Sequence, residues 1–197
     1  MTTNRSNTDD FDPGPLAEVQ STLDDGRWTL VFTRDFRHTP DRVWTALTDP
    51  TELASWAPFT TSRDLATIGD AVLTMIDGDT SEDLPAAVTR VEPPNLLEYT
   101  WGDDRLRWEL RPTAAGTCLT LHHTVHLGPD WLPKVAAGWH LCLLVADRLL
   151  AGSPIPPIRG QDALNYRWST LADAYAAALD LLEALRPSSS DEGHATA

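Results

Sequence analysis

The sequence predicts a single α+β domain that combines an antiparallel sheet with a long C-terminal helix. Three observations lead to this prediction. One strand is followed by two short helices, a run of alternating segments with short turns comes next, and the last third changes to helical spacing. The chain has 197 residues, 42% of them hydrophobic, which is enough for one sizeable core.

The first strand lies at about 28–34, where Trp28, Leu30 and Phe32 alternate with smaller polar and β-branched residues. Thr39 then offers an N-cap, and Pro40 suits the first position of a helix. A second helix start is predicted at 49–52, where the sequence DPTE has the capping-box pattern. Two short helices are therefore expected after the first strand.

Five strand-like segments follow, separated by turn signals such as DGD at 77–79 and GDD at 102–104. They lie at about 70–77, 84–92, 95–101, 104–112 and 116–127. Parallel strands need long crossover connections, and these turns are short. The five segments are therefore expected to form an antiparallel meander.

The last third of the chain has helical spacing. Asp130 can cap a helix that runs to about Ala151, and a final helix is expected at about 162–185, with Leu164 and Tyr175 in its buried stripe. Three prolines at 153–160 interrupt the pattern. The sequence leaves open whether they kink one continuous helix or separate two.

The two ends of the chain are predicted to lie outside this domain. Residues 1–25 carry six acidic side chains against Arg5, which is typical of an acidic, disordered tail, with a short helix at 16–23. Residues 187–197 are polar and are expected to be a disordered C-terminal tail. The folded domain is therefore placed at 26–186.

Charge and composition exclude several classes of partner. There are 29 acidic and 15 basic residues, and a net charge of −14 would repel nucleic acid and anionic membrane surfaces. No apolar run approaches the 18 or so residues of a membrane span, and no secretory signal is visible. Cys118 and Cys142 are read as buried free thiols. A cytoplasmic protein is expected.

Five segments resemble one protein family in their order along the chain. They are FTRDFRHTPDRVWTALTDPTELASW (32–56), NLLEYTW (95–101), LRWELRP (106–112), GTCLTLHH (116–123) and AAGWHLCLLVADRLLAG (136–152). These sequence segments resemble the SRPBCC, or START-like, superfamily, in the group homologous to the C-terminal domain of the heat-shock-protein-90 ATPase activator. The resemblance covers roughly 28–180. It implies a helix-grip (START/Bet v 1-like) fold, in which a curved sheet wraps a helix and leaves a cavity between them.

Aromatic and histidine side chains are the candidates for the wall of that cavity. The chain contains eight Trp, and indoles serve either as bulky core or as the lining of an aromatic pocket. The candidate ligand-binding residues are Trp56, Phe59, Trp101, Trp108, His123, Trp139 and His140. His123 matches a position in the usual sequence of this strand in the family, and it would be the polar anchor for a ligand if it faces the cavity. Ordinary core packing is the alternative for each aromatic residue.

The histidine cluster at 122–126 is not expected to bind a metal. On a strand, His122 and His126 would lie roughly 13 Å apart, too far to share one zinc ion. The strand alternation places His123 on the helix-facing side and the other two on the outer face. We therefore expect no metal site and no cofactor.

Three functions remain open at this point. The first is a protein that binds a small hydrophobic or aromatic molecule in the cavity. The second is a cyclase- or hydratase-type enzyme that uses the same cavity, with His123 or an inward carboxylate as general base. The third is a stress-related protein-interaction module, and a homodimer could form through the sheet edge or the C-terminal helices. The sequence shows neither a nucleophile next to a base nor a Gly-rich phosphate loop, so no catalytic residue is assigned.

Overall fold

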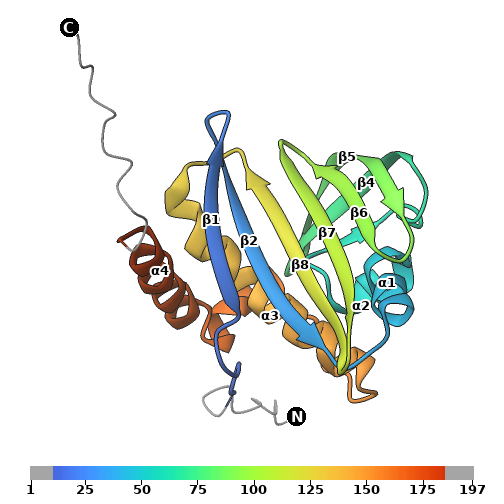
Figure 1. Cartoon of the computed structure of the whole chain (residues 1–197). Helices are drawn as coiled ribbons and strands as arrows, with labels where there is room; N and C mark the ends of the chain where they lie inside the picture. Colours follow the sequence, from blue (N-terminus) through green and yellow to red (C-terminus); the bar gives the residue numbers. More distant parts are fainter. Residues whose placement is uncertain (1–10, 185–197) are drawn as a thin grey trace, which may run out of the picture.

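A computed structural model describes residues 11–184 and has the predicted α+β architecture. Eight antiparallel strands form one curved, open sheet in the order β1-β2-β8-β7-β6-β5-β4-β3 (Figure 1). The strands are β1 (Glu18–Asp24), β2 (Arg27–Phe36), β3 (Phe59–Thr61), β4 (Gly69–Asp77), β5 (Thr80–Glu92), β6 (Leu96–Trp101), β7 (Asp104–Thr113) and β8 (Gly116–Val125). The helices are α1 (Pro40–Thr48), α2 (Pro50–Trp56), α3 (Leu132–Leu150) and α4 (Trp168–Ala184), with 3-10 turns η2 (Pro129–Trp131) and η3 (Gly160–Tyr166).

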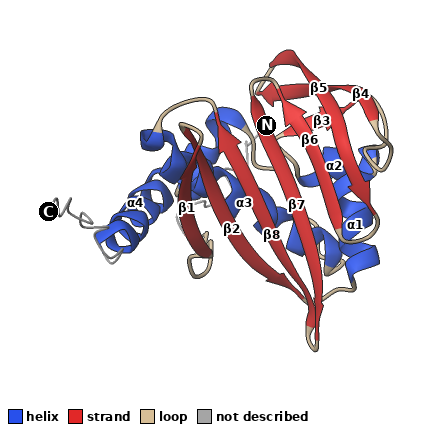
Figure 2. Cartoon of the chain, turned by 45° about the horizontal axis from the view of Figure 1, so that its top comes forward, coloured by secondary structure: helices blue, strands red, loops and turns tan. Residues whose placement is uncertain are grey.

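Long helix α3 crosses one face of the sheet and buries the core against it (Figure 2). The pairing of β2 with β8, which places Phe32 opposite Leu121, joins the β1–β2 hairpin to the last strand of the meander. Alternate residues of β7 and β8 point at the helix, among them Leu106, Trp108 and Leu121, and all three are buried. None of the helices in the described part of the chain is long and apolar enough to cross a membrane.

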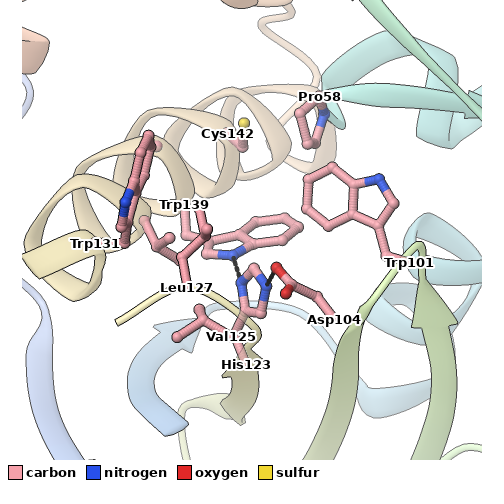
Figure 3. A pocket seen from close by; sticks show the side chains of 11 residues that line it. Pro58, Trp101, Asp104, His123, Val125, Leu127, Trp131, Trp139 and Cys142 are labelled. Atoms are coloured by element: carbon pink, nitrogen blue, oxygen red, sulfur yellow. Dashed lines mark hydrogen bonds and ion pairs between the residues drawn. The ribbon is translucent and has the colours of Figure 1, made fainter. Parts of the chain in front are cut away.

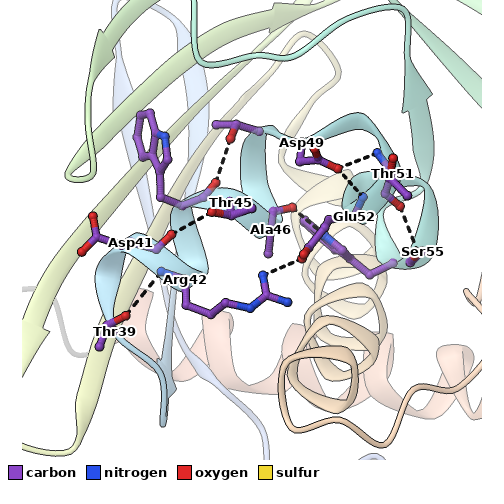
Figure 4. A network of polar contacts seen from close by, with 12 residues as sticks. Thr39, Asp41, Arg42, Thr45, Ala46, Asp49, Thr51, Glu52 and Ser55 are labelled. Atoms are coloured by element: carbon purple, nitrogen blue, oxygen red, sulfur yellow. Dashed lines mark hydrogen bonds and ion pairs between the residues drawn. The ribbon is translucent and has the colours of Figure 1, made fainter.

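Helices α1 and α2 begin at the two predicted caps (Figure 4). The Thr39 hydroxyl accepts a hydrogen bond from the Arg42 amide at 3.4 Å, and the Asp49 carboxylate accepts from the amides of Thr51 and Glu52 at 2.8 and 3.0 Å. An ion pair of 2.7 Å between Arg42 and Glu52 ties the two helices together. These local contacts let two helices of nine and seven residues form without a long apolar stripe.

The prolines at 154, 156 and 157 separate two helices. Helix α3 ends at Leu150, an extended segment follows, and α4 begins at Trp168. Proline lacks the amide hydrogen that a continuing helix needs, so three prolines close together end the helix. Helix α4 packs on α3 and β1 at the edge of the molecule (Figure 1). Tyr175 is buried as predicted, whereas Leu164 lies in η3 and is 54% exposed.

The domain begins earlier than the sequence predicted. Residues 18–24, assigned to a disordered tail and to a short helix, form strand β1, which pairs with β2 along its whole length. Val19 points into the core while Glu18 and Gln20 stay exposed, so one apolar residue on an edge strand left little periodic signal. The three-residue strand β3 was also missed. Residues 1–10 and the predicted tail at 187–197 lie outside the described part of the chain.

Candidate ligand-binding site

A cavity of about 220 Å³ lies between α3 and the ends of strands β6, β7 and β8 (Figure 3). Its wall is mostly apolar. It is formed by Pro58, Trp101, Asp104, His123, Val125, Leu127, Trp131, Val135, Gly138, Trp139 and Cys142. Leu127 and Trp131 are 40% and 44% exposed, which places them at the mouth of the cavity.

One face of α3 supplies the helical side of the wall. Val135, Gly138, Trp139 and Cys142 follow the i, i+3, i+4, i+7 spacing, which puts them on one stripe of a helix. Gly138 contributes no side chain to this stripe. A Cβ atom built at Gly138 would meet nothing within 4 Å, so the cavity is open directly above it.

Indole rings form the aromatic part of the wall. The rings of Trp101 and Trp139 meet at 65°, with their centroids 6.1 Å apart, and Trp131 lies on the other side of Trp139 (Figure 3). Trp108 packs behind Trp139 edge to face, with the two ring centroids 5.1 Å apart. Such perpendicular contacts fix the orientation of Trp139 in the wall.

The tautomer of His123 follows from its two hydrogen-bond partners. The Trp139 Nε1–H donates to His123 Nδ1 at 3.0 Å, and an indole nitrogen can only donate. Nδ1 is therefore unprotonated, so the proton of the neutral ring is on Nε2, which donates to Asp104 Oδ2 at 2.8 Å. Both ring nitrogens of this 2% exposed residue are thus occupied within the protein.

Asp104 is the centre of this polar cluster. Its Oδ1 accepts hydrogen bonds from the backbone amide and the Nδ1 of His126, both at 2.7 Å. Burial alone would raise the pKa of Asp104, but the hydrogen bonds from His123 and His126 outweigh burial and lower the pKa to about 2. The carboxylate is therefore charged at neutral pH.

Three of the seven predicted ligand-binding residues line the cavity, namely Trp101, His123 and Trp139. The other three aromatic residues lie behind the wall, as core packing. Trp56 and Trp108 pack edge to face, with ring centroids 6.4 Å apart. The Trp56 indole nitrogen donates to Ala46 O, and that of Trp108 donates to Tyr99 Oη. Phe59 packs against the Trp101 ring at 5.3 Å and so supports the wall without reaching the cavity.

His140 is not part of the cavity wall, because it points to the opposite side of α3. It is fully buried, with Nε2 2.8 Å from the carbonyl oxygen of Pro13 and Nδ1 2.7 Å from the hydroxyl of Tyr175. A carbonyl can only accept, so Nε2 carries the proton and Nδ1 accepts from Tyr175. Burial, together with the nearby positive charge of Arg34, lowers the pKa of His140. The neutral ring joins the N-terminal segment to α4.

His122 and His126 have different partners, and the strand alternation that predicted His126 on the outer face does not reach it because β8 ends at Val125. His122 lies on the outer face, 3.7 Å from Glu109, whereas His126 follows the end of β8 and binds Asp104. Among residues 11–184, no group of three or more His, Cys, Asp or Glu side chains is arranged to hold a metal ion.

Asp104, Trp131 and Gly138 belong to the cavity but were not predicted from the sequence. The helical spacing from Trp139 could have pointed to Gly138, because a residue one position before Trp139 shares its stripe with Val135 and Cys142. Asp104 looked like part of a turn, since GDD at 102–104 is a common turn sequence. Its pairing with His123 depends on the register between β7 and β8, which places Leu106 opposite His123.

A curved antiparallel sheet that grips a long helix around an apolar cavity defines a helix-grip protein of the SRPBCC type. The sequence profile of the family described as "Activator of Hsp90 ATPase homolog 1-like protein" matches residues 37–150, more than half of the chain. The chain therefore belongs to this family, as its sequence segments suggested. A comparison with curated proteins finds no match.

Solved structures share the fold at low sequence identity. A conserved protein of unknown function from Enterococcus faecalis, EF2215, is 17% identical with a TM-score of 0.62, covering 86% of this chain and 93% of its own. CalU16 from Micromonospora echinospora is 18% identical with a TM-score of 0.58, covering 82% and 95%. An AHSA1-like protein from Aeromonas hydrophila is 21% identical with a TM-score of 0.53, covering 64% and 93%. At these identities the similarity establishes the fold alone.

Proposed function

We propose that this protein binds a small hydrophobic or aromatic molecule in the cavity between the sheet and α3. The observation that carries the proposal is the cavity itself, about 220 Å³ in volume and walled by Trp101, Trp131, Trp139 and aliphatic side chains. An apolar molecule gains roughly 25 cal/mol for each Å² of its surface that leaves water. Indole faces add specific stacking and edge contacts with a flat ring.

The enzyme alternative receives less support from the geometry. A cyclase or hydratase that used an inward carboxylate as general base would have to use Asp104, whose pKa is lowered to about 2, so it is a weak base. One that used His123 would need a free ring nitrogen facing the ligand. His123 Nδ1 already accepts from Trp139, and Nε2 already donates to Asp104. No observation specifically favours the protein-interaction alternative. A homodimer and a cytoplasmic location stay predictions.

Filling the cavity from the helix side tests the proposal. A Cβ atom at Gly138 meets nothing within 4 Å, and Gly138 lines the cavity, so we expect Gly138→Leu to fold and to fill the binding volume with its side chain. The matched control is Ala177→Leu, which adds a similar side chain at an exposed position of α4. Thermal unfolding would be followed with and without a set of small aromatic probes, both neutral and charged.

A ligand at 100 times its dissociation constant stabilises the folded protein by about 2.7 kcal/mol. We expect at least one probe to raise the melting temperature of the wild type and of Ala177→Leu but not that of Gly138→Leu. The proposal is wrong if no probe stabilises the wild type, or if Gly138→Leu is stabilised as much as the control.

A further inference from the structure

We infer that the cavity selects an uncharged, flat aromatic molecule of one or two rings and holds it without a hydrogen bond. The inference rests on the proposed function and narrows it to a class of ligand. It also changes the role predicted for His123, which becomes part of the wall instead of a polar anchor.

The polar atoms of His123, which lie in the wall, are already used inside the protein. Both ring nitrogens of His123 are used by Trp139 and Asp104. The Trp101 indole nitrogen has no partner among the described residues, but it is buried and lies on the side of the ring away from Trp139 (Figure 3). A ligand in the cavity therefore meets ring faces, ring edges and alkyl groups.

The charges around the cavity disfavour both anionic and cationic ligands. Asp104 is ionised, and an anionic ligand would enter a confined apolar space beside this carboxylate. Lys134 lies 4.4 Å above the Trp131 ring but is exposed, so solvent screens its charge. A cationic ligand would be attracted by Asp104, but three of the roughly four acceptor positions of a carboxylate are already in use there. Either charged ligand would lose its hydration without full replacement.

The volume and shape of the cavity suit a small, flat ring system. An apolar cavity of about 150 Å³ is large enough for benzene. The volume here is about 220 Å³, which suits a substituted benzene or two fused rings. Trp101 and Trp139 form a corner of 65°, so a flat ring lying on one indole presents its edge to the other.

Gly138 sets the depth of the cavity. Glycine is a poor residue for the middle of a helix, and no backbone reason requires it here because its φ is not positive. Its missing side chain leaves the space above α3 open, since a Cβ atom there would touch nothing within 4 Å. Any larger residue at 138 would occupy the space of the second ring.

Equilibrium dialysis of the full chain at pH 7 with three probes of one shape tests the inference. The probes are naphthalene, 2-naphthoate and 2-naphthylmethylammonium. We expect naphthalene to bind at least about tenfold more tightly than either charged probe, because neither charge finds a free partner in the wall. Benzene, in a second series, should bind more weakly than naphthalene, and pyrene should not bind.

Variants at Gly138 separate failure of this inference from failure of the proposed function. Gly138→Ala should weaken naphthalene more than benzene, and Gly138→Leu should abolish binding of both, while Ala177→Leu behaves as the wild type. Binding that is lost in Gly138→Leu but is equal or tighter for a charged probe overturns the inference and leaves the proposed function standing. Absence of binding by every probe, or binding that persists in Gly138→Leu, overturns both. If Gly138→Leu does not fold, Gly138→Ala decides through the benzene-to-naphthalene ratio.

Discussion

Asp104 is the residue on which the polar part of the wall depends. It receives hydrogen bonds from His123 and His126, and without its charge those donors would lose their acceptor. These hydrogen bonds lower the pKa of Asp104 to about 2, so the carboxylate is charged at neutral pH. The charged form is the one that contributes to stability.

This predicts a pH dependence with a definite sign. The folded-state pKa of Asp104 lies below the ordinary value of 3.8, so its contribution is fully present above about pH 4 and is lost as the pH falls towards 2. Asp104→Asn should lower the free energy of unfolding at pH 7 by about 2 kcal/mol or less, since the side chain is partly exposed. Urea unfolding at pH 7 and between pH 5 and 2 measures both effects. Asp103→Asn serves as control. A loss that is equal at pH 7 and pH 2 would contradict this role.

Alanine substitutions at two glycines are expected to change the free energy of unfolding in opposite directions. Gly138→Ala should raise the free energy of unfolding by about 0.5–1 kcal/mol, because it improves helix propensity and meets no neighbour. Gly116→Ala should lower it, because φ is +146° and the new Cβ would collide with the backbone of Phe36 and His38. Denaturant unfolding of both variants checks the pair. Destabilisation by Gly138→Ala would show that the space above α3 is already filled.

At the scale of elements, a short polar chain fastens the N-terminal segment and α4 to α3. The Ala17 amide donates to the Tyr175 hydroxyl at 3.0 Å, this hydroxyl donates to His140, and His140 donates to Pro13 O. Every donor in the chain has an acceptor, and the central groups are buried. The segment before β1 is therefore held in place although it was predicted to be a tail.

Removing the central hydroxyl should loosen this segment. Tyr175→Phe leaves the Ala17 amide and His140 Nδ1 without their partner, which should cost about 1–3 kcal/mol of stability. Hydrogen exchange at the Ala17 amide should become faster, since its acceptor is gone. Tyr166→Phe is the matched control on the preceding turn. Unchanged exchange at Ala17 in Tyr175→Phe would mean that this contact does not hold the segment.

Most elements could be predicted because their signals are local. The caps at Thr39 and Asp49, the turns of the meander and the three prolines each act within a few residues. Strand β1 could not be recognised because its stability comes from pairing with β2, and only Val19 of its seven residues is buried among hydrophobic neighbours. The turn η3 formed where helical spacing predicted the start of the last helix, so Leu164 lies outside the buried stripe.

At the scale of the whole molecule, the cavity depends on contacts between distant parts of the chain. Trp101 ends β6 and Asp104 begins β7, on either side of the turn that joins these strands. His123 comes from β8, and Trp139 comes from α3. Strand parity predicted that His123 faces inward, but its partners depend on the register of β7 with β8 and on the rotation of α3. For the same reason the sequence predicted an aromatic cavity but could not separate its wall from the core behind it. Trp56, Trp108 and Trp139 have the same chemical character and differ only in position.

Trp101, Trp131 and Trp139 enclose the space proposed to hold an aromatic molecule. The most direct test is the ¹⁵N–¹H spectrum of the indole N–H groups during a naphthalene titration, with resonances assigned by single Trp→Phe variants. A bound ring should shift the signals of Trp101, Trp131 and Trp139 saturably and leave those of Trp44 and Trp168 unchanged, because only the first three line the cavity. Shifts confined to Trp44 or Trp168, or no saturable shift at all, would contradict the claim.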